Sequence, residues 1–192
     1  MRKIFAILGK TCVGKDTLTR LVSIKTGHPI ATSFTTRPMR NGETEGVEYN
    51  FIDKQSFLDL IGCDLLAECT SYDVAGGEVW YYGYTKEELE KDEYTLVIVN
   101  PEGYRQIKKL YGDKVCSILI DADIKTRIDR YLNRDEVDDL KALECCRRVL
   151  ADEAMFKGLE FDYYINNIVK DHSFREMLDI IRKEVEHCEN KK

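Results

Sequence analysis

Two segments near the N-terminus carry side chains that could do phosphate chemistry. The first is Gly9-Lys10-Thr11-Cys12-Val13-Gly14-Lys15-Asp16-Thr17, and the second is Ser33-Phe34-Thr35-Thr36-Arg37-Pro38-Met39-Arg40. Glycines spaced as in the first segment let successive backbone N–H groups converge on phosphate oxygens, and a lysine placed like Lys15 reaches the terminal phosphates of a nucleoside triphosphate. The guanidinium groups of Arg37 and Arg40 could each make bidentate hydrogen bonds to another phosphate. A loop that binds a phosphoryl donor and a pair of arginines that binds a phosphoryl acceptor together predict phosphoryl transfer.

The residues around the first segment predict the strand and helix that such a loop requires. Ile4–Leu8 is a continuous apolar run, typical of a strand buried on both faces, and Lys15–Lys25 has apolar residues at nearly helical spacing. Further strands are predicted at 95–99, 115–120 and, more weakly, 163–165, and helices at 87–91, 104–110, 124–132, 139–156 and 173–188. This alternation predicts an α/β fold with a mainly parallel sheet flanked by helices.

Residues 33–85 have a different character. They are rich in turn residues and aromatic side chains, and their strand-like stretches are short. The pair Gly76-Gly77 predicts a hairpin turn there. We expect an inserted subdomain over the carboxyl edge of the sheet, within a single domain of 192 residues.

The composition excludes several classes of function. A formal net charge of -6 leaves no basic surplus for nucleic acid or for an anionic membrane surface. The seven cysteines are odd in number and lack the paired spacing of a zinc site, so reduced thiols are expected. The N-terminal apolar run is too short for a signal peptide or a membrane span. We therefore expect a cytoplasmic protein with small-molecule partners.

The residue that follows Lys15 departs from the usual phosphate loop. A Ser or Thr hydroxyl is expected at that position, and here it is Asp16, followed by Thr17. Its carboxylate could hold Mg²⁺ directly or through water, since Mg²⁺ prefers oxygen ligands. It could equally serve as an acidic residue in the first turn of a helix, stabilised by the helix dipole. Asp16 and Thr17 are the candidate metal ligands, and both interpretations of Asp16 stay open.

The second segment continues into Asn41-Gly42-Glu43 and on to Gly46-Val47-Glu48-Tyr49-Asn50-Phe51, and with this extension it resembles the guanylate kinase family. The family pattern S-x-T-T-R-x-x-R-x-G-E-x-x-G-x-x-Y-x-F is matched almost position by position from Ser33 to Phe51, within a likeness that covers essentially the whole chain. The resemblance implies a P-loop nucleoside monophosphate kinase fold with a core (1–32, 86–125 and 155–192), a subdomain for the monophosphate (33–85) and a helical lid (126–154).

The resemblance also implies roles for individual residues. The acceptor's phosphate would be held by Ser33, Arg37, Arg40, Tyr49 and Tyr82, and its base would be read by Glu68, with Tyr84 and Asn100 beside it. Catalysis would use Lys15 and Arg37 together with the lid arginines Arg130, Arg134 and Arg147. ATP would lie on residues 9–17, with Asn167 near the adenine, and Mg²⁺ would accompany it.

Three further features of the sequence depart from the family. The segment between Tyr72 and Tyr81 is longer than in most relatives, Tyr84 replaces a small hydroxyl residue that reads the guanine carbonyl, and Ile98 and Asn100 replace two aspartates. A phenol at Tyr84 could still donate the hydrogen bond. Since charge is lost at Ile98 and gained at Asp16, we hypothesise that Asp16 takes over part of the Mg²⁺ role.

These residues favour ATP-dependent phosphorylation of a purine nucleoside monophosphate, GMP or dGMP above all. The runner-up is a ribose bisphosphate phosphokinase, a related enzyme that often has Asp after the loop lysine. A third reading is an inert guanylate-kinase-like module that binds phosphopeptides. The intact Gly9, Gly14 and Lys15 argue against that module, and the oligomeric state is left open.

Overall fold

The computed structural model describes residues 2–74, 77–133 and 139–190. In chain order its elements are β1 (Lys3–Gly9), α1 (Lys15–Thr26), β2 (Phe34–Thr35), β3 (Asn50–Phe51), α2 (Lys54–Gly62), β4 (Leu66–Asp73), β5 (Val79–Thr85), α3 (Lys86–Glu90), β6 (Tyr94–Ile98), α4 (Pro101–Tyr111), a 3₁₀ turn (Gly112–Lys114), β7 (Val115–Asp121), α5 (Ile124–Leu132), α6 (Asp139–Phe156), β8 (Tyr163–Asn166) and α7 (Lys170–Glu189).

The larger sheet confirms the predicted α/β class. Its strands lie in the order β6-β1-β7-β8, and every pairing in it is parallel. Ile30 extends the sheet beyond β6 through a parallel bridge to Leu96. Ile7 of β1 is level with Ile98 of β6 and with Ile118 of β7, so the three strands end at one edge of the sheet. The segment that follows β1 therefore starts where ligands bind in open α/β sheets.

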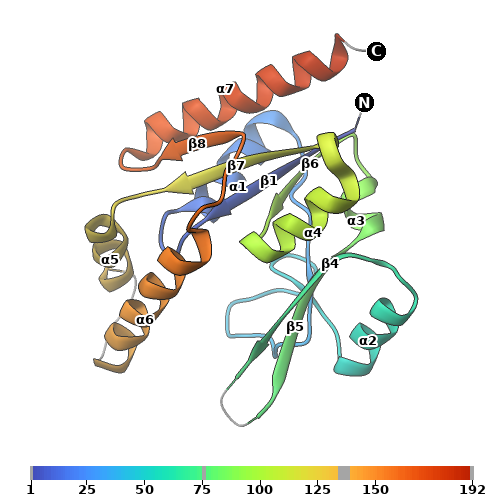
Figure 1. The fold of residues 1–192 in the computed structure, drawn as a ribbon, viewed down its shortest axis with the longest axis vertical. Coiled ribbons are helices and arrows are strands. Elements are labelled where there is room, and N and C mark those ends of the chain that lie inside the picture. The colour runs from blue at the N-terminus through green and yellow to red at the C-terminus, as the bar shows by residue number, and fades with distance from the viewer. Residues whose placement is uncertain (1, 75–76, 134–138, 191–192) are drawn as a thin grey trace.

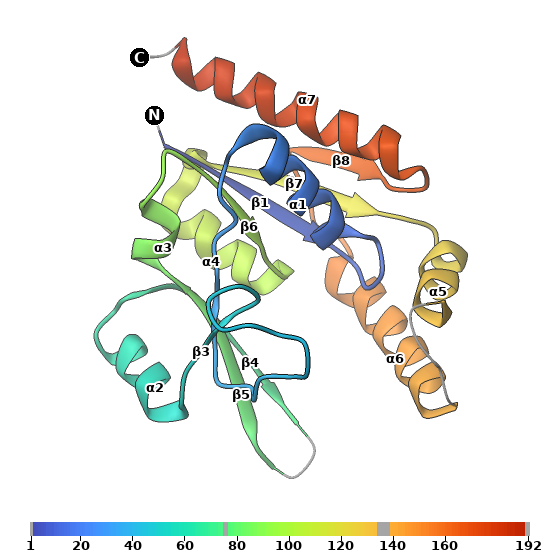
Figure 2. The same ribbon diagram turned by 180° about the vertical axis from the view of Figure 1, so that it is seen from behind.

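The apolar runs of the strands bury both faces of this sheet. Phe5 and Ile7 of β1 belong to the core under α1 and α7, whereas Ile4, Ala6 and Leu8 belong to a second core that includes Ile107 of α4. Alternate residues of a strand point to opposite faces, so an uninterrupted apolar run is what two buried faces require. Figure 1 shows α4 in front of the sheet, and Figure 2, the view from behind, shows α1 on the opposite face with α7 alongside.

A second, smaller sheet is built from residues 33–85. Its order is β3-β2-β5-β4, with β2 parallel to β3 and the other pairs antiparallel. The helix α2 in this region was not expected from the sequence; Asp53 caps it by accepting a hydrogen bond from the Ser56 N–H. The expected turn at 76–77 lies partly outside the described residues, and Gly77 has a φ of 80°.

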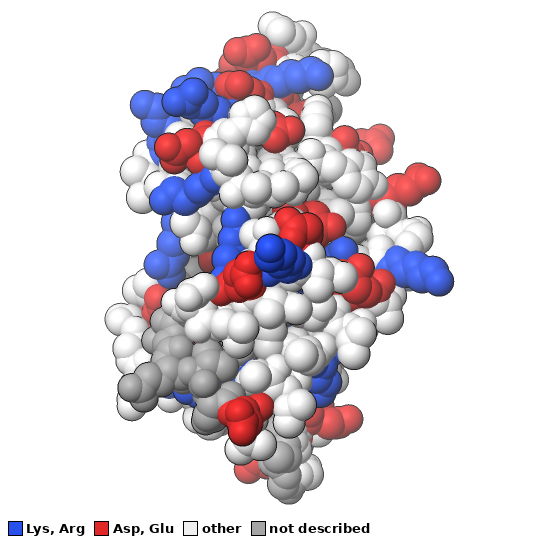
Figure 3. All heavy atoms as spheres, turned by 90° about the vertical axis from the view of Figure 1, so that its left-hand side faces the viewer, with Lys and Arg blue, Asp and Glu red and all other residues white. Residues whose placement is uncertain are grey.

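The hairpin β4–β5 and the helices α5 and α6 project from the same side of the core (Figure 1). On the face shown in Figure 3, acidic and basic side chains are interspersed. All seven cysteines are free. None of the helices in the described ranges is long and apolar enough to cross a membrane.

Candidate active site

The loop between β1 and α1 has the geometry of a phosphate cradle. A Cβ atom on Gly9 would lie 2.7 Å from Val13 Cγ2 and 2.8 Å from the Ile120 carbonyl oxygen, so only glycine fits at this point. Gly14 has a φ of 85°, in the left-handed region, and α1 begins at the next residue, Lys15. The N-terminus of α1 thus opens directly onto the loop, which favours a bound anion.

Lys15 lies at the mouth of this loop with its side chain 26% exposed. Its Nζ is 3.5 Å from the Asp16 carboxylate, which is largely exposed at the start of α1. Thr17 is exposed as well. The three side chains are therefore accessible beside the loop, where the terminal phosphates of a triphosphate and its metal ion would lie.

Two predicted site residues hold the backbone of the loop. The Asn167 amide donates to the Val13 carbonyl at 2.7 Å, and Arg130 donates to the same carbonyl at 3.2 Å and to the Asn167 carbonyl at 2.7 Å. Asn167 is 3% exposed, and its Oδ1 atom is buried with no hydrogen-bond partner among the described residues. Both residues thus reach the donor loop, while the contact of Asn167 with adenine stays a prediction.

Of the other predicted arginines, Arg147 is not brought to the loop in this structure. Arg147 is on the exposed side of α6 and forms a forked ion pair with Glu144, at 2.6 and 2.7 Å. Arg134 lies outside the described residues. The helix α5 ends at Leu132, with Asn133 as its C-cap.

Arg37 is the centre of a buried cluster in the smaller sheet's region. It is 4% exposed, and its guanidinium forms a forked ion pair with Glu43, at 2.7 and 3.0 Å. The same group lies 5.1 Å from the ring centre of Tyr49 and 5.5 Å from that of Phe51, which are cation–π distances. The hydrogen bonds that Arg37 donates to Glu43 raise the pKa of Arg37, although burial opposes the shift. The arginine is therefore fixed in one orientation before any ligand arrives.

The sequence reasoning missed Glu43 as a partner of Arg37. One of its oxygens also accepts the backbone N–H of Arg40, at 2.7 Å, so this single carboxylate orders both members of the predicted arginine pair. The side chain of Arg40 is left exposed. The available signal was the acidic residue three positions after the second arginine, which could close the loop onto both.

Aromatic side chains lie beside this cluster. Tyr82 lies edge-on to Tyr49, with ring centres 5.9 Å apart, and edge-on to Tyr72, at 5.6 Å. Burial raises the pKa of the Tyr49 hydroxyl, so it stays a hydrogen-bond donor at neutral pH. Ser33 is buried just before β2. The structure thus brings Arg37, Tyr49 and Tyr82 together, and their role in holding a phosphate stays a prediction.

Glu68 is a buried carboxylate on β4, opposite Tyr84 of β5. It is 5% exposed, and its Oε1 accepts the Tyr84 backbone N–H at 3.2 Å. A Cβ atom on Gly103 would lie 2.6 Å from Glu68 Oε2, so the glycine lets α4 approach the carboxylate closely. Burial raises the pKa of Glu68 to about 7, against the Tyr84 hydrogen bond and with a contribution from Glu102. Such a group suits a ligand that supplies hydrogen-bond donors.

Tyr84 does not act as expected. Its ring is 7% exposed within the core that includes Val97 and Val99, and its hydroxyl donates to the Ile98 carbonyl at 2.8 Å. Since a hydroxyl has one proton to donate, the expectation that this phenol donates to a guanine carbonyl is wrong for this structure. The bulk of the ring is accommodated in the core.

Asn100 has two roles that the structure makes visible. Its Oδ1 caps α4 by accepting the Gly103 N–H at 2.8 Å, and its Nδ2 donates to the Tyr72 hydroxyl at 2.7 Å. The second bond joins the β4–β5 hairpin to the core. Whether Asn100 also contacts an acceptor base stays a prediction.

The buried carboxyl of Glu68 gives a prediction about stability. A carboxyl whose pKa is raised on folding binds its proton more tightly in the native state. The contribution of the Glu68 carboxyl to the free energy of unfolding is therefore fully present below its pKa in the unfolded chain. This contribution is lost as the pH rises through about 7, its pKa in the folded protein. Glu68→Gln should raise the free energy of unfolding at pH 8 by on the order of 2–3 kcal/mol and change it little at pH 5.

Urea denaturation at the two pH values measures this difference. The matched control is Glu87→Gln, an exposed glutamate on α3 whose replacement should have little effect at either pH. An unchanged unfolding free energy of the Glu68→Gln protein at pH 8 would contradict the raised pKa.

Comparisons with known proteins agree with this geometry. The guanylate kinase family model matches residues 1–184. The guanylate kinase of Helicobacter hepaticus is 32% identical over 169 residues, covering 85% of this chain and 82% of that protein. The guanylate kinase of Coxiella burnetii is 30% identical over 187 residues, covering 94% of this chain and 87% of the relative.

Solved structures show the same fold. The crystal structure of guanylate kinase from Anaplasma phagocytophilum superposes with a TM-score of 0.64 at 21% identity, over 95% of this chain and 86% of that one. An uncharacterized protein from Eubacterium ventriosum gives a TM-score of 0.54 at 14% identity, over 97% and 99% of the two chains. With its phosphate loop, its buried arginine cluster and a family match over almost its whole length, the chain belongs to the guanylate kinase family.

Proposed function

We propose that the protein transfers the terminal phosphoryl group of ATP to GMP or dGMP, producing ADP and the nucleoside diphosphate. The relatives at 27–32% identity are guanylate kinases, and the chain keeps a nucleotide loop with Gly9, Gly14 and Lys15 in place. The observation that carries the choice of acceptor is the spacing between the Arg37 cluster and Glu68 on one sheet.

That spacing follows from the strand register. Tyr82, whose ring lies edge-on to Tyr49 of the Arg37 cluster, is two residues from Tyr84 on β5, and Tyr84 pairs with Glu68. Two residues along a strand span about 7 Å, roughly the separation of the phosphate and the base in a nucleoside monophosphate. The cationic end would bind the phosphate. The buried carboxylate would accept hydrogen bonds from the ring N–H and the exocyclic amine of guanine.

The chain's own side chains supply the rest of the reaction. Lys15 would neutralise charge on the transferred group, and Arg130, held at the Val13 carbonyl, lies close enough to the loop to assist. The acceptor phosphate, fixed by Arg37, would attack in line with the departing ADP, so that positioning does most of the catalytic work. Closure of the lid would exclude water that otherwise hydrolyses ATP.

Mg²⁺ fits this site as a companion of ATP. Within the described residues, no group of three or more His, Cys, Asp or Glu side chains is arranged to hold a metal ion. Mg²⁺ commonly needs only one or two carboxylates besides water and phosphate oxygens, and the exposed Asp16 and Thr17 at the loop can provide protein oxygens. When bound, the ion would offset the charge of the phosphates.

The role of Asp16 can be measured. Asp16→Ala should raise the Mg²⁺ concentration for half-maximal activity by about tenfold, because a carboxylate beside the bound metal is lost. Asp171→Ala is the matched control, since Asp171 also lies in the first turn of a helix, α7, and is exposed. If the two variants show the same Mg²⁺ activation curve as the unaltered protein, Asp16 has no metal role and acts only at the helix start.

The two alternatives are less well supported. A ribose bisphosphate has no base and carries several negative charges, so it gains nothing from the buried carboxylate of Glu68. A phosphopeptide-binding module has no need of the narrow cradle at Gly9 and Gly14 or of Lys15 beside it. The guanylate kinase relatives favour the enzyme over both.

The direct test is an ATP-consumption assay with a panel of acceptors: GMP, dGMP, IMP, AMP, UMP, CMP and ribose bisphosphate. We expect GMP and dGMP to give the highest kcat/KM, because only guanine presents two adjacent donors to Glu68. Consumption with ribose bisphosphate alone would replace the proposed acceptor. If none of these acceptors causes ATP consumption although the protein binds ATP, the kinase function is excluded.

A further inference from the structure

A fully buried arginine outside the predicted site contacts the donor loop. The side chain of Arg127, on α5, is 0% exposed. Its Nε donates to the Thr11 carbonyl at 2.9 Å, Nη1 donates to Glu153 at 2.8 Å, and Nη2 donates to Asp152 at 2.6 Å. A guanidinium removed from water in this way is costly unless it is paired and hydrogen-bonded, and here each of its three nitrogens donates a bond.

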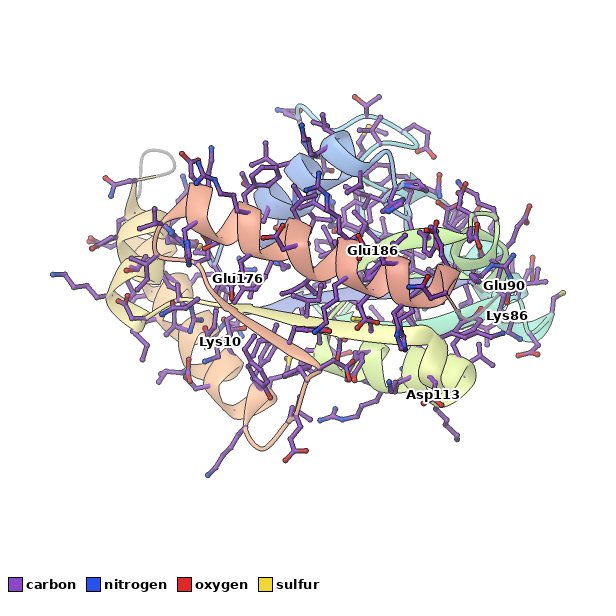
Figure 4. The ribbon with its side chains drawn as sticks, turned by 90° about the horizontal axis from the view of Figure 1, so that it is seen from above. Lys10, Lys86, Glu90, Asp113, Glu176 and Glu186 are labelled. Carbon is purple, nitrogen blue, oxygen red and sulfur yellow. The ribbon has the colours of Figure 1, made fainter. Side chains whose placement is uncertain are left out.

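The carboxylates that hold Arg127 also reach the loop themselves. Asp152 Oδ2 accepts the Thr11 backbone N–H at 2.7 Å. Glu153 pairs with Lys10 Nζ at 3.0 Å, and that same ammonium lies 3.1 Å from Asp121 at the end of β7. In Figure 4, Lys10 is labelled near the end of β7 and next to α6. The bonds to Glu153 and Asp121 raise the pKa of Lys10 in spite of its burial, so the cation is retained.

This arrangement fixes one peptide segment from both sides. The N–H of Thr11 is held by Asp152 and its carbonyl by Arg127, so the peptide groups on both sides of this residue have set orientations. The next residue, Cys12, has a φ of 63°, which is unfavourable for any residue other than glycine. Such a conformation persists where the surroundings impose it, and the paired bonds at Thr11 do so.

We propose that Arg127 and Asp152 are positioning residues for ATP: they set the shape of the donor loop from the lid helices α5 and α6. The Thr11 clamp, defined as the bonds of Arg127 and Asp152 to Thr11, makes the loop's affinity for a triphosphate depend on where α6 lies. The inference rests on the proposed use of this loop for ATP. Neither residue touches the acceptor cluster around Arg37, so the clamp acts on the donor side.

The experiment uses Asp152, because removing Arg127 would leave two carboxylates without their buried cation. Asp152→Ala deletes both the acceptor for the Thr11 N–H and the partner of Arg127, whereas Asp152→Asn keeps an acceptor oxygen and loses only the charge. Binding of a fluorescent ATP analogue, measured without any acceptor, should weaken about tenfold in Asp152→Ala and by a smaller factor in Asp152→Asn. The KM for ATP should rise in the same order, while the KM for GMP changes less than about twofold.

The control is Lys3→Met. It breaks the ion pair of Lys3 with Glu184, at 2.9 Å and similarly buried, at the other end of β1. This variant should lose stability but keep the affinity for the ATP analogue. Equal weakening in Lys3→Met and Asp152→Ala would overturn the proposal, since general loosening would then explain both. A folded Asp152→Ala protein with unchanged analogue affinity would overturn it too. Because no acceptor is present, neither result depends on whether GMP is the acceptor.

Discussion

Lys15→Ala should lower kcat for GMP phosphorylation by about 100- to 1,000-fold, the usual effect of removing one preorganised charge that stabilises a transition state. Lys15 stands at the junction of the glycine loop and α1, with its ammonium 3.5 Å from Asp16. Its charge is needed most as the bond to the transferred phosphoryl group breaks. We therefore expect the loss mainly in kcat, with a smaller rise in the KM for ATP.

The fold should survive this change. The Lys15 side chain is partly exposed, so the variant should unfold at nearly the same temperature as the unaltered protein. Lys25→Ala, an exposed lysine in the last turn of the same helix, is the matched control and should keep full activity. A Lys15→Ala enzyme with kcat within a fewfold of the original would contradict the role of the loop lysine.

Arg37→Ala should lower kcat/KM for GMP by more than about 100-fold, since truncating one partner of a buried charge pair commonly costs 2–5 kcal/mol. The variant would lose the predicted phosphate contact and leave Glu43, its partner at 2.7 Å, as an unpaired negative charge in the acceptor's place. The KM for ATP should change little, because the donor loop is separate. Steady-state kinetics with each substrate varied in turn measures the difference.

Arg37→Lys should fail to restore activity. A lysine cannot make the forked pair with Glu43 or lie flat against Tyr49 as the guanidinium does. Arg105→Ala, at an exposed position on α4, is the control for loss of a positive charge. Activity within threefold of normal in Arg37→Ala would mean that the acceptor phosphate binds elsewhere.

The parts of the fold that depend on local pattern could be predicted from sequence. Ile4–Leu8 is a continuous apolar run and Lys15–Lys25 has apolar residues at nearly helical spacing, and they form β1 and α1 with nearly the expected ends. The parallel sheet followed from the alternation of such segments. Helix α2 was missed because its region is dominated by turn residues and aromatics, although Asp53 and Ser56 formed a usable cap signal.

The candidate site was predictable only where its residues are close in sequence. The phosphate loop and the Arg37–Tyr49 segment are contiguous, and the family likeness supplied their roles. The direction of the Tyr84 phenol depends on packing against β6, and the partners of Arg127 lie 25 and 26 residues away on α6. On sequence alone, Arg127 would be taken for a solvated helix arginine. Contacts of this kind arise from tertiary packing, which no local pattern encodes.

The central claim is tested most directly by following the transferred group. The purified protein is incubated with Mg²⁺, GMP and ATP that is radioactively labelled in its terminal phosphate, and the nucleotides are then separated. The account predicts label in GDP, in amounts equal to the ADP formed, and labelling of GDP at least about 100-fold slower when the Lys15→Ala protein is used. Label that stays in ATP or appears only as inorganic phosphate, while the protein binds both nucleotides, would contradict it.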